Sequence, residues 1–301
     1  MTGPPARVLD LLGVLPGSVV ALKDLPPGNG SWAAETADGQ RVVLRRYHFR
    51  STAADLAYEH RVLVHLSDRG WVVPVPVSRL CEHDGRFYCL TRYVPGRAVA
   101  AETAAQQRRR GRDLARLHLG LRGLGGRIGQ RPGWRAQHSG FSVHTGLDWQ
   151  ACVRALSEAS PRLGQWLQSA AAQAHADLAA VGADRLPLLV VHGDFAEWNV
   201  HYDRGRLAGV VDFGLTHLDS RPYELAIART YRAPQVTEAY RAQLARLGWP
   251  LSELEEAAIE PVYRAFRVDM ASWPAEELLR GGEANLAVIE RQLARTGTKP
   301  G

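Results

Sequence analysis

The sequence predicts an α+β chain in which a strand-rich N-terminal part precedes a larger, mainly helical part. Two observations lead to this prediction. Residues 18–92 contain short runs with strand composition, separated by turns rich in Gly, Pro and Asp. Beyond them Ala, Leu and Arg dominate, and apolar residues recur at the 3.6-residue period of helices that bury one face. The 301 residues, 46% of them hydrophobic, are enough to fill two hydrophobic cores.

The N-terminal part is predicted to contain five strands and one helix. The helix, residues 56–66, carries apolar residues at helical spacing. The strands are residues 18–22, 31–36, 41–46, 77–81 and 87–92. The loop between the first two strands contains Gly28, Gly30 and Ser31, and its glycines would let backbone N–H groups approach a phosphate. An ordinary turn between strands has the same composition, so this loop alone is a weak indication.

Two short motifs are the most informative feature of the chain. The tripeptide His-Gly-Asp at 192–194 is followed, after four residues, by Asn199, and Asp-Phe-Gly occupies 212–214. This is the frame of a kinase catalytic loop and of the metal-binding turn that follows it. The residues between, 200–211, read as strand, turn and strand. Such a hairpin would bring Asn199 and Asp212 to neighbouring strand ends.

These residue types suit phosphoryl transfer. In that reaction one carboxylate orients the acceptor hydroxyl, and oxygen ligands hold Mg²⁺ on the nucleotide phosphates. Because Mg²⁺ prefers hard oxygen ligands and retains several waters, one amide and one carboxylate suffice beside the phosphate oxygens. We therefore predict Asp194 as the catalytic carboxylate and Asn199 and Asp212 as ligands of Mg²⁺.

The two motifs resemble those of the aminoglycoside phosphotransferase and choline kinase-like family, the small-molecule branch of the protein-kinase fold. In that branch the loop reads His-Gly-Asp, as at 192–194. Gly193 stands where protein kinases carry the Arg that grips an activation-loop phosphate, which disfavours a protein kinase. Residues 221–226 resemble the helix start that follows the metal motif, although Glu224 stands where the family usually has Asp. The resemblance implies ATP or GTP as donor, Mg²⁺, and a hydroxyl of a small molecule as acceptor.

The resemblance also implies a protein-kinase-like fold of two lobes. An N-terminal nucleotide-binding lobe would comprise residues 1–93, and a C-terminal catalytic and acceptor-binding lobe residues 94–301, with a hinge at about 92–97. At this hinge, backbone groups from Arg92 to Val94 would bond the edge of the adenine base.

Three further side chains receive roles from the resemblance. Arg45, on the third predicted strand, would clamp the α- and β-phosphates, because its guanidinium fork can bind phosphate oxygens in a bidentate manner. Arg46 would point to the opposite face of the strand. Glu59 would pair with Arg45, unless it is simply a solvent-facing helix residue. His192 would brace the catalytic loop.

Composition excludes several other classes. The net charge of +6 arises from scattered Arg without aromatic platforms, so we expect no nucleic-acid partner, and the run at 108–112 reads as a solvated helix face. No apolar run is long enough for a membrane span. Because no secretory signal is seen and Cys81, Cys89 and Cys152 read as reduced thiols, we expect a cytoplasmic protein.

The acceptor and the oligomeric state stay open. Homoserine, amino alcohols, sugars and antibiotics fit these residues equally, as do a monomer and a homodimer. Seven acidic residues between Glu253 and Glu277 could contact a polyamine, although solvated helix faces are commoner. The Gly- and Arg-rich segment 120–146 could border the acceptor pocket. A catalytically inactive nucleotide-binding scaffold and a protein kinase are the alternative classes.

Overall fold

The computed structural model describes residues 4–14, 20–21, 30–36, 38–48, 50–99, 101–141, 148–229, 233–279 and 282–299. The chain divides into two compact units, Met1–Ala100 with Trp198–Gly214, and Ala101–Glu197 with Leu215–Gly301. The first is rich in strands and the second is mainly helical, which confirms the predicted α+β class. The predicted lobe boundary and the hinge at 92–97 stay predictions. Within the described ranges, no helix has the length and apolar character needed to cross a membrane.

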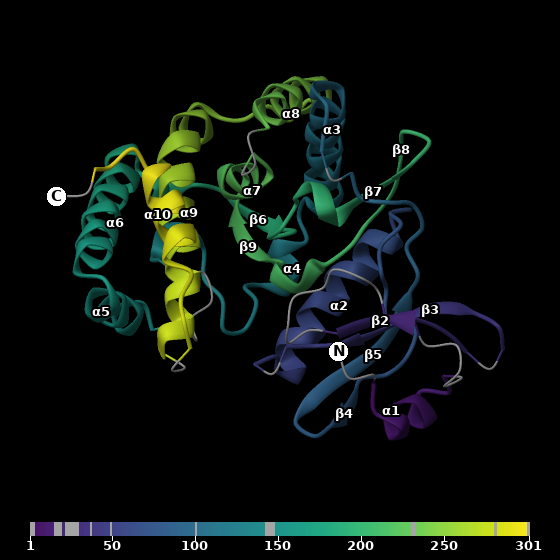
Figure 1. Ribbon diagram of the computed structural model, residues 1–301. Helices are drawn as coiled ribbons and strands as arrows, with labels where there is room; N and C mark the ends of the chain where they lie inside the picture. The colour runs from purple at the N-terminus through teal and green to yellow at the C-terminus, as the bar shows by residue number, and fades with distance from the viewer. Residues whose placement is uncertain are drawn as a thin grey trace. The chain divides into compact units, whose positions relative to one another are not determined.

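The smaller unit is built on an antiparallel sheet with the strand order β1-β2-β3-β5-β4 (Figure 1). Its elements are α1 (Ala6–Leu11), β1 (Val20–Ala21), β2 (Gly30–Glu35), β3 (Arg41–Arg46), α2 (Ala53–Ser67), β4 (Cys81–His83) and β5 (Arg86–Arg92). Helix α2 begins after Thr52, whose hydroxyl accepts the N–H of Asp55, so a capping side chain fixes where the helix starts.

Alternation along β3 gives the two faces of the sheet different functions. Val42 and Leu44 are buried in a core that also contains Trp32 and residues of α1. Since successive side chains of a strand point to opposite faces, Arg45 lies on the other face, where it meets Glu59 of α2. Arg46 points to the face opposite Arg45, as predicted, and there it lies over the Trp32 ring.

The predicted strand at 77–81 is wrong in its position. The strand β4 begins only at Cys81, and the preceding residues follow β5 irregularly. The N–H groups of Val77 and Ser78 both donate to the carbonyl of Leu90, while the N–H of Leu90 donates to the Ser78 hydroxyl. A side chain thus replaces a backbone acceptor, and the regular ladder is interrupted at this point.

The hairpin predicted between the two motifs is present. Strands β7 (Val200–Asp203) and β8 (Arg206–Val210) pair in antiparallel fashion. Within the smaller unit, Arg97 and Tyr202 exchange backbone hydrogen bonds, and the N–H of Val210 donates to the carbonyl of Val72. The hairpin is therefore fixed to the strand-rich unit by backbone contacts on both of its strands.

The larger unit surrounds one short antiparallel strand pair with helices (Figure 1). Its elements are α3 (Ala104–Leu121), α4 (Gly125–Ile128), α5 (Trp149–Ala159), α6 (Pro161–Val181), β6 (Leu188–Val191), β9 (His217–Ser220), α7 (Arg221–Ala228), α8 (Pro234–Arg246), α9 (Glu253–Leu279) and α10 (Leu286–Ala294). Helices α5, α6, α7 and α10 all pack on α9, and the main core lies between them.

The Arg-rich run at 108–112 is not the solvated helix face that was predicted, because Arg108 is exposed while Arg110 and Gly111 are buried. Arg110 is only 1% exposed, and it lies on the buried side of α3 together with Leu114, Leu117 and His118. The guanidinium is hydrogen-bonded inside the unit, so the residue is part of the interior.

Candidate active site

The His-Gly-Asp loop follows directly from the end of β6 in the larger unit. The side chain of His192 is buried, and its Nδ1 accepts the backbone N–H of Asp194 at 3.1 Å. Asp194 itself is partly exposed. Gly193 adopts φ 85°, and a Cβ there would lie 2.1 Å from the carbonyl oxygen of Leu215. Both the backbone conformation and the lack of space therefore require glycine at the centre of this loop.

Glu224 holds the same loop from the first turn of α7. Its buried carboxylate accepts the backbone N–H groups of His192, Gly193 and Phe195. His118 Nε2 lies 3.9 Å from this carboxylate. Burial alone would raise the pKa of Glu224, but the interaction with His118, the nearby His192 and the bond from Gly193 hold that pKa below its usual range. The family-atypical Glu therefore has a structural role that its sequence position left in doubt.

We expect Glu224→Gln to weaken both the fold and the loop. A glutamine presents an amide N–H₂ where backbone N–H groups need an acceptor, and each buried donor left unpaired costs roughly 1–3 kcal/mol. Urea unfolding should show this loss at neutral pH, where the wild-type carboxylate is ionised. Because the pKa of Glu224 is lowered in the folded state, the difference in unfolding free energy between wild type and variant should be fully present above the usual carboxyl range. This difference should shrink as the pH falls through the pKa of folded Glu224. Glu256→Gln, on an exposed pair with Arg241, is the matched control; equal losses in both variants would contradict the role.

The predicted cation and carboxylate meet in the smaller unit. Arg45 Nη1 lies 2.8 Å from Glu59 Oε1, and Arg45 Nη2 lies 2.9 Å from Asp212 Oδ1. Glu59 is fully buried, so the solvent-facing alternative is wrong for this residue. Burial alone would lower the pKa of Arg45, but Glu59 and Asp212 raise it above its ordinary value. The fork of the guanidinium thus binds two carboxylates at once, which a lysine ammonium does with less directional precision.

Asn199 directly precedes β7, and Asp212 follows the end of β8, so both lie at the open end of the hairpin. The N–H of Val211 donates to the carbonyl of Asn199 at 2.9 Å, which joins the residues next to β7 and β8. Asp212 adopts φ 61°, rare for a residue with a side chain, and its side chain is about half exposed. An amide oxygen and a carboxylate fit the oxygen preference of Mg²⁺. Within the described ranges, no group of three or more His, Cys, Asp or Glu residues forms a site for a metal ion alone, so any metal bound here needs other oxygen ligands as well.

The other residues predicted to bind the nucleotide are Gly28, Gly30, Ser31, Arg92 and Val94. Gly28 lies outside the described residues. Gly30 begins β2, where a Cβ would collide with the Trp32 ring, so packing already explains this glycine. Ser31 pairs with Arg45 across the sheet. The N–H of Arg92 donates to Val75, so a contact with an adenine edge would need other backbone groups, including those of the buried Val94.

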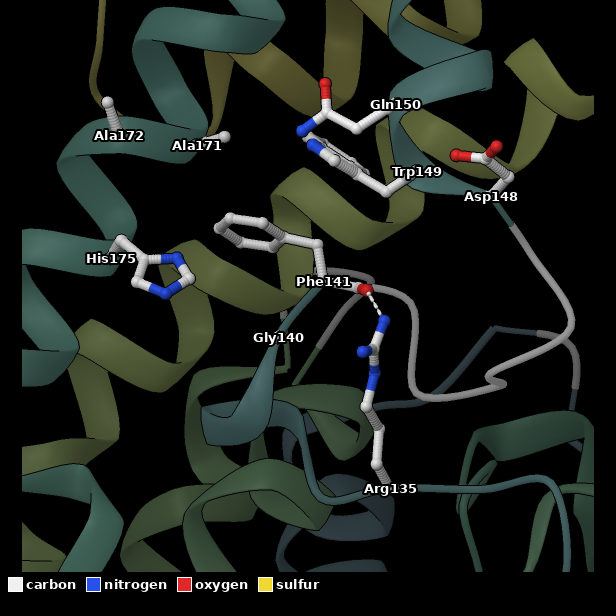
Figure 2. Close-up of a pocket in the computed structure, with 9 residues that line it drawn as sticks. All are labelled: Arg135, Gly140, Phe141, Asp148, Trp149, Gln150, Ala171, Ala172 and His175. Carbon is white, nitrogen blue, oxygen red and sulfur yellow. Dashed lines mark hydrogen bonds between the residues drawn. The ribbon is translucent and has the colours of Figure 1, made fainter.

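A cavity of about 530 Å³ lies in the larger unit. Figure 2 shows Phe141 between Trp149 and His175, with Arg135 donating a hydrogen bond to the Phe141 carbonyl. The ring centroids of Phe141 and Trp149 are 4.9 Å apart. Three lining residues, Arg135, Gly140 and Phe141, belong to the segment predicted to border an acceptor pocket.

Three of the seven acidic residues predicted as a possible polyamine contact form ion pairs within the larger unit. Glu255 is buried and forms an ion pair with Arg221, Glu256 pairs with Arg241, and Glu260 pairs with Arg229. Their charges are balanced by arginines of α7 and α8 and by the residue after α7. This arrangement favours a structural role for these three carboxylates.

The His-Gly-Asp loop, the Asn and Asp beside a hairpin and the Arg–Glu pair on an α+β fold define a small-molecule kinase. The model of the phosphotransferase enzyme family matches residues 23–260, and the chain belongs to that family.

Relatives and solved structures agree with this assignment. Homoserine kinase of Caulobacter vibrioides is 28% identical over 287 residues, covering 88% of this chain and 86% of the relative. Homoserine kinase of Phenylobacterium zucineum is 28% identical, covering 94% and 90% of the two chains. Among solved structures, an amicoumacin kinase superposes with a TM-score of 0.69 at 16% identity, covering 96% of this chain and 92% of that one. A microcompartment-associated aminopropanol kinase gives a TM-score of 0.63 at 18% identity, covering 98% and 99%. These likenesses confirm the protein-kinase-like fold.

Proposed function

We propose that this chain transfers the γ-phosphoryl group of ATP, with Mg²⁺, to a hydroxyl of a small metabolite. Asp194 orients the acceptor hydroxyl and accepts its proton, while His192 and Glu224 fix the loop that carries it. Asn199 and Asp212 hold the magnesium ion, and Arg45, steadied by Glu59, clamps the phosphates. The bound metal would neutralise charge on the transferring group. The observation that carries the proposal is the Arg45 fork, which links Glu59 to the Asp212 of the metal motif.

Homoserine is the acceptor we propose to test first. Two relatives that span most of this chain are homoserine kinases, and the name of one structural neighbour gives aminopropanol, an amino alcohol, as its substrate. ATP is favoured as donor because a related aminoglycoside phosphotransferase was solved with ADP and hygromycin B. GTP is the alternative donor. We also propose that the protein is soluble and cytoplasmic, and that it is a monomer or a homodimer.

The test is nucleotide turnover by the purified chain against a panel of acceptors. ADP or GDP release is followed with homoserine, aminopropanol, sugars and aminoglycosides, with and without EDTA. Acceptor-dependent release that needs a divalent metal supports the proposal and identifies the acceptor class. Metal-dependent nucleotide binding with no turnover on any acceptor would instead favour the inactive scaffold, and labelling of protein substrates would favour a protein kinase.

We further propose that the aromatic cavity receives part of the acceptor. Gln137, in the segment that lines it, donates its backbone N–H to Asp219 of β9, and β9 pairs with the strand that leads into the catalytic loop. The segment is thereby anchored to the same strand pair as His192 and Asp194.

Filling the cavity should weaken acceptor binding alone. Ala172 lines the cavity from α6 and is exposed, so Ala172→Trp adds volume there without removing core contacts. We expect the KM for the acceptor to rise about threefold to tenfold, comparable to an aromatic contact of about 0.5–1.5 kcal/mol, with the KM for ATP unchanged. Ala176→Trp, one turn further along α6 and also exposed, is the control. An unchanged acceptor KM in Ala172→Trp would remove the cavity from the proposal.

A further inference from the structure

Arg110 is a buried cation that the proposed chemistry does not use. It lies on α3 and is 1% exposed. Its Nε and Nη2 donate to the two carboxylate oxygens of Glu102 at 2.9 and 2.8 Å, so its charge is paired inside the unit. A buried guanidinium is costly unless every donor is satisfied, which makes its remaining contacts informative.

The remaining contacts of Arg110 reach the catalytic loop and the helix behind it. Nη1 donates to the backbone carbonyl of Phe195 at 3.2 Å and to that of Ala228 at 2.8 Å. Phe195 directly follows Asp194, and Ala228 is the last residue of α7. Nη2 also lies 3.8 Å from the carboxylate of Glu197, two residues further along the loop.

Both backbone polar groups of Phe195 are therefore hydrogen-bonded to side chains. Its N–H donates to Glu224 at the start of α7, and its carbonyl accepts from Arg110. The same guanidinium satisfies a carbonyl at the C-terminal end of α7, where a positive charge is favourable. Both ends of α7 are in this way tied to the residue next to Asp194.

We propose that Arg110 is a positioning residue for phosphoryl transfer, which it supports by holding the backbone after Asp194 in place. The inference rests on the proposed role of Asp194. Arg110 is not proposed to contact ATP or the acceptor, and it acts through the carbonyl of Phe195. Its planar fork satisfies Glu102 and two carbonyls together, and a lysine ammonium has too few donors, in the wrong directions, to replace it.

The first test is hydrogen exchange of the 301-residue chain, which needs no acceptor. Peptides covering residues 192–199 should exchange faster in Arg110→Gln than in wild type, and peptides from α5 and α6 should not. Arg112→Gln, which changes a partly buried arginine of the same helix, is the control and should leave the loop unchanged. Unchanged exchange at 192–199 in Arg110→Gln would overturn the inference.

The second test separates positioning from mere stability. In Arg110→Gln and Arg110→Lys, kcat per folded molecule should fall on the order of 10- to 100-fold, because small displacements at a reacting centre are costly, while the Kd for ATP stays near wild type. Glu102→Gln removes the ion-pair partner but leaves the guanidinium its two carbonyls, so it should destabilise the fold yet keep most of the kcat. If kcat fell equally in the Glu102 and Arg110 variants, in proportion to their loss of stability, the role of Arg110 would be structural only.

Asp194→Asn, measured alongside on ATP and homoserine, keeps the two proposals distinguishable. Wild-type turnover in that variant would contradict the proposed function itself. Loss of turnover in Asp194→Asn, together with normal loop exchange in Arg110→Gln, would contradict only the role of Arg110.

Discussion

Replacing Asp194 with Asn is expected to lower kcat about 10²- to 10⁴-fold, the range for removal of a general base. Asparagine keeps the shape of the side chain but cannot accept the proton of the acceptor hydroxyl. Its backbone N–H would still donate to His192, so the loop should keep its conformation. Nucleotide binding should change little, since the predicted phosphate and metal residues are elsewhere. Stopped-flow or steady-state ADP release, together with calorimetric titration of ATP, would measure both quantities.

Two controls sharpen this expectation. Asp203→Asn changes an exposed carboxylate in the hairpin and should keep wild-type turnover. If Asp194 is the base, the kcat of the wild type should fall at acidic pH, and the kcat of Asp194→Asn should not show this fall. Residual turnover within a factor of about three of wild type would be too large for a missing general base and would contradict the assignment.

Replacing Asp212 with Ala should impair metal-dependent nucleotide binding rather than the chemical step alone. The substitution removes a predicted ligand of Mg²⁺ and one of the two carboxylates that hold Arg45. We expect the Kd for ATP with Mg²⁺ to rise at least about tenfold, since one charge-assisted contact is worth roughly 1.5–3 kcal/mol. The affinity measured in EDTA should change much less. Calorimetry with and without Mg²⁺ distinguishes the two conditions.

The fold should survive this second substitution. Arg45 keeps its pair with the fully buried Glu59, and Asp212 is about half exposed, so its pair with Arg45 contributes little to stability. Asp203→Ala, in the same hairpin, is the matched control for lost negative charge. A magnesium-dependent affinity that is equal in wild type and Asp212→Ala would remove Asp212 from the metal site.

Much of the fold could be predicted because it follows local sequence rules. The hairpin between the motifs has turn residues at its centre and valines at its outer ends, and β3 coincides with the predicted strand at 41–46. The opposite orientation of Arg45 and Arg46 follows from the two-residue period of a strand. The contact of Arg45 with Glu59 depended on the family resemblance, because the two residues are 14 positions apart.

Other features could not be predicted because long-range contacts decide them. The strand expected at 77–81 is displaced by a hydrogen bond from Leu90 to the Ser78 hydroxyl, 12 residues away. Glu224 acquires its role from backbone groups about 30 positions earlier in the chain. Such partners are visible only after the helix that carries Glu224 has been placed against the loop.

Arg110 shows that one local signal was overlooked. Its position is four residues before Leu114 and eight before His118, which places it on the apolar stripe of α3. A charged residue on such a stripe is either paired in the interior or at the edge of the helix face. The high density of Arg in the run at 108–112 concealed this periodicity.

In the proposed reaction a phosphoryl group moves from ATP to an acceptor hydroxyl, with Asp194 accepting the proton of that hydroxyl. Mass spectrometry of the acceptor after incubation with ATP, Mg²⁺ and either wild type or Asp194→Asn detects this transfer directly. We expect phosphorylated acceptor, with homoserine tested first, in the wild-type reaction and only a trace with the variant. Phosphate released to water with no phosphorylated acceptor, or equal product from both proteins, would contradict it.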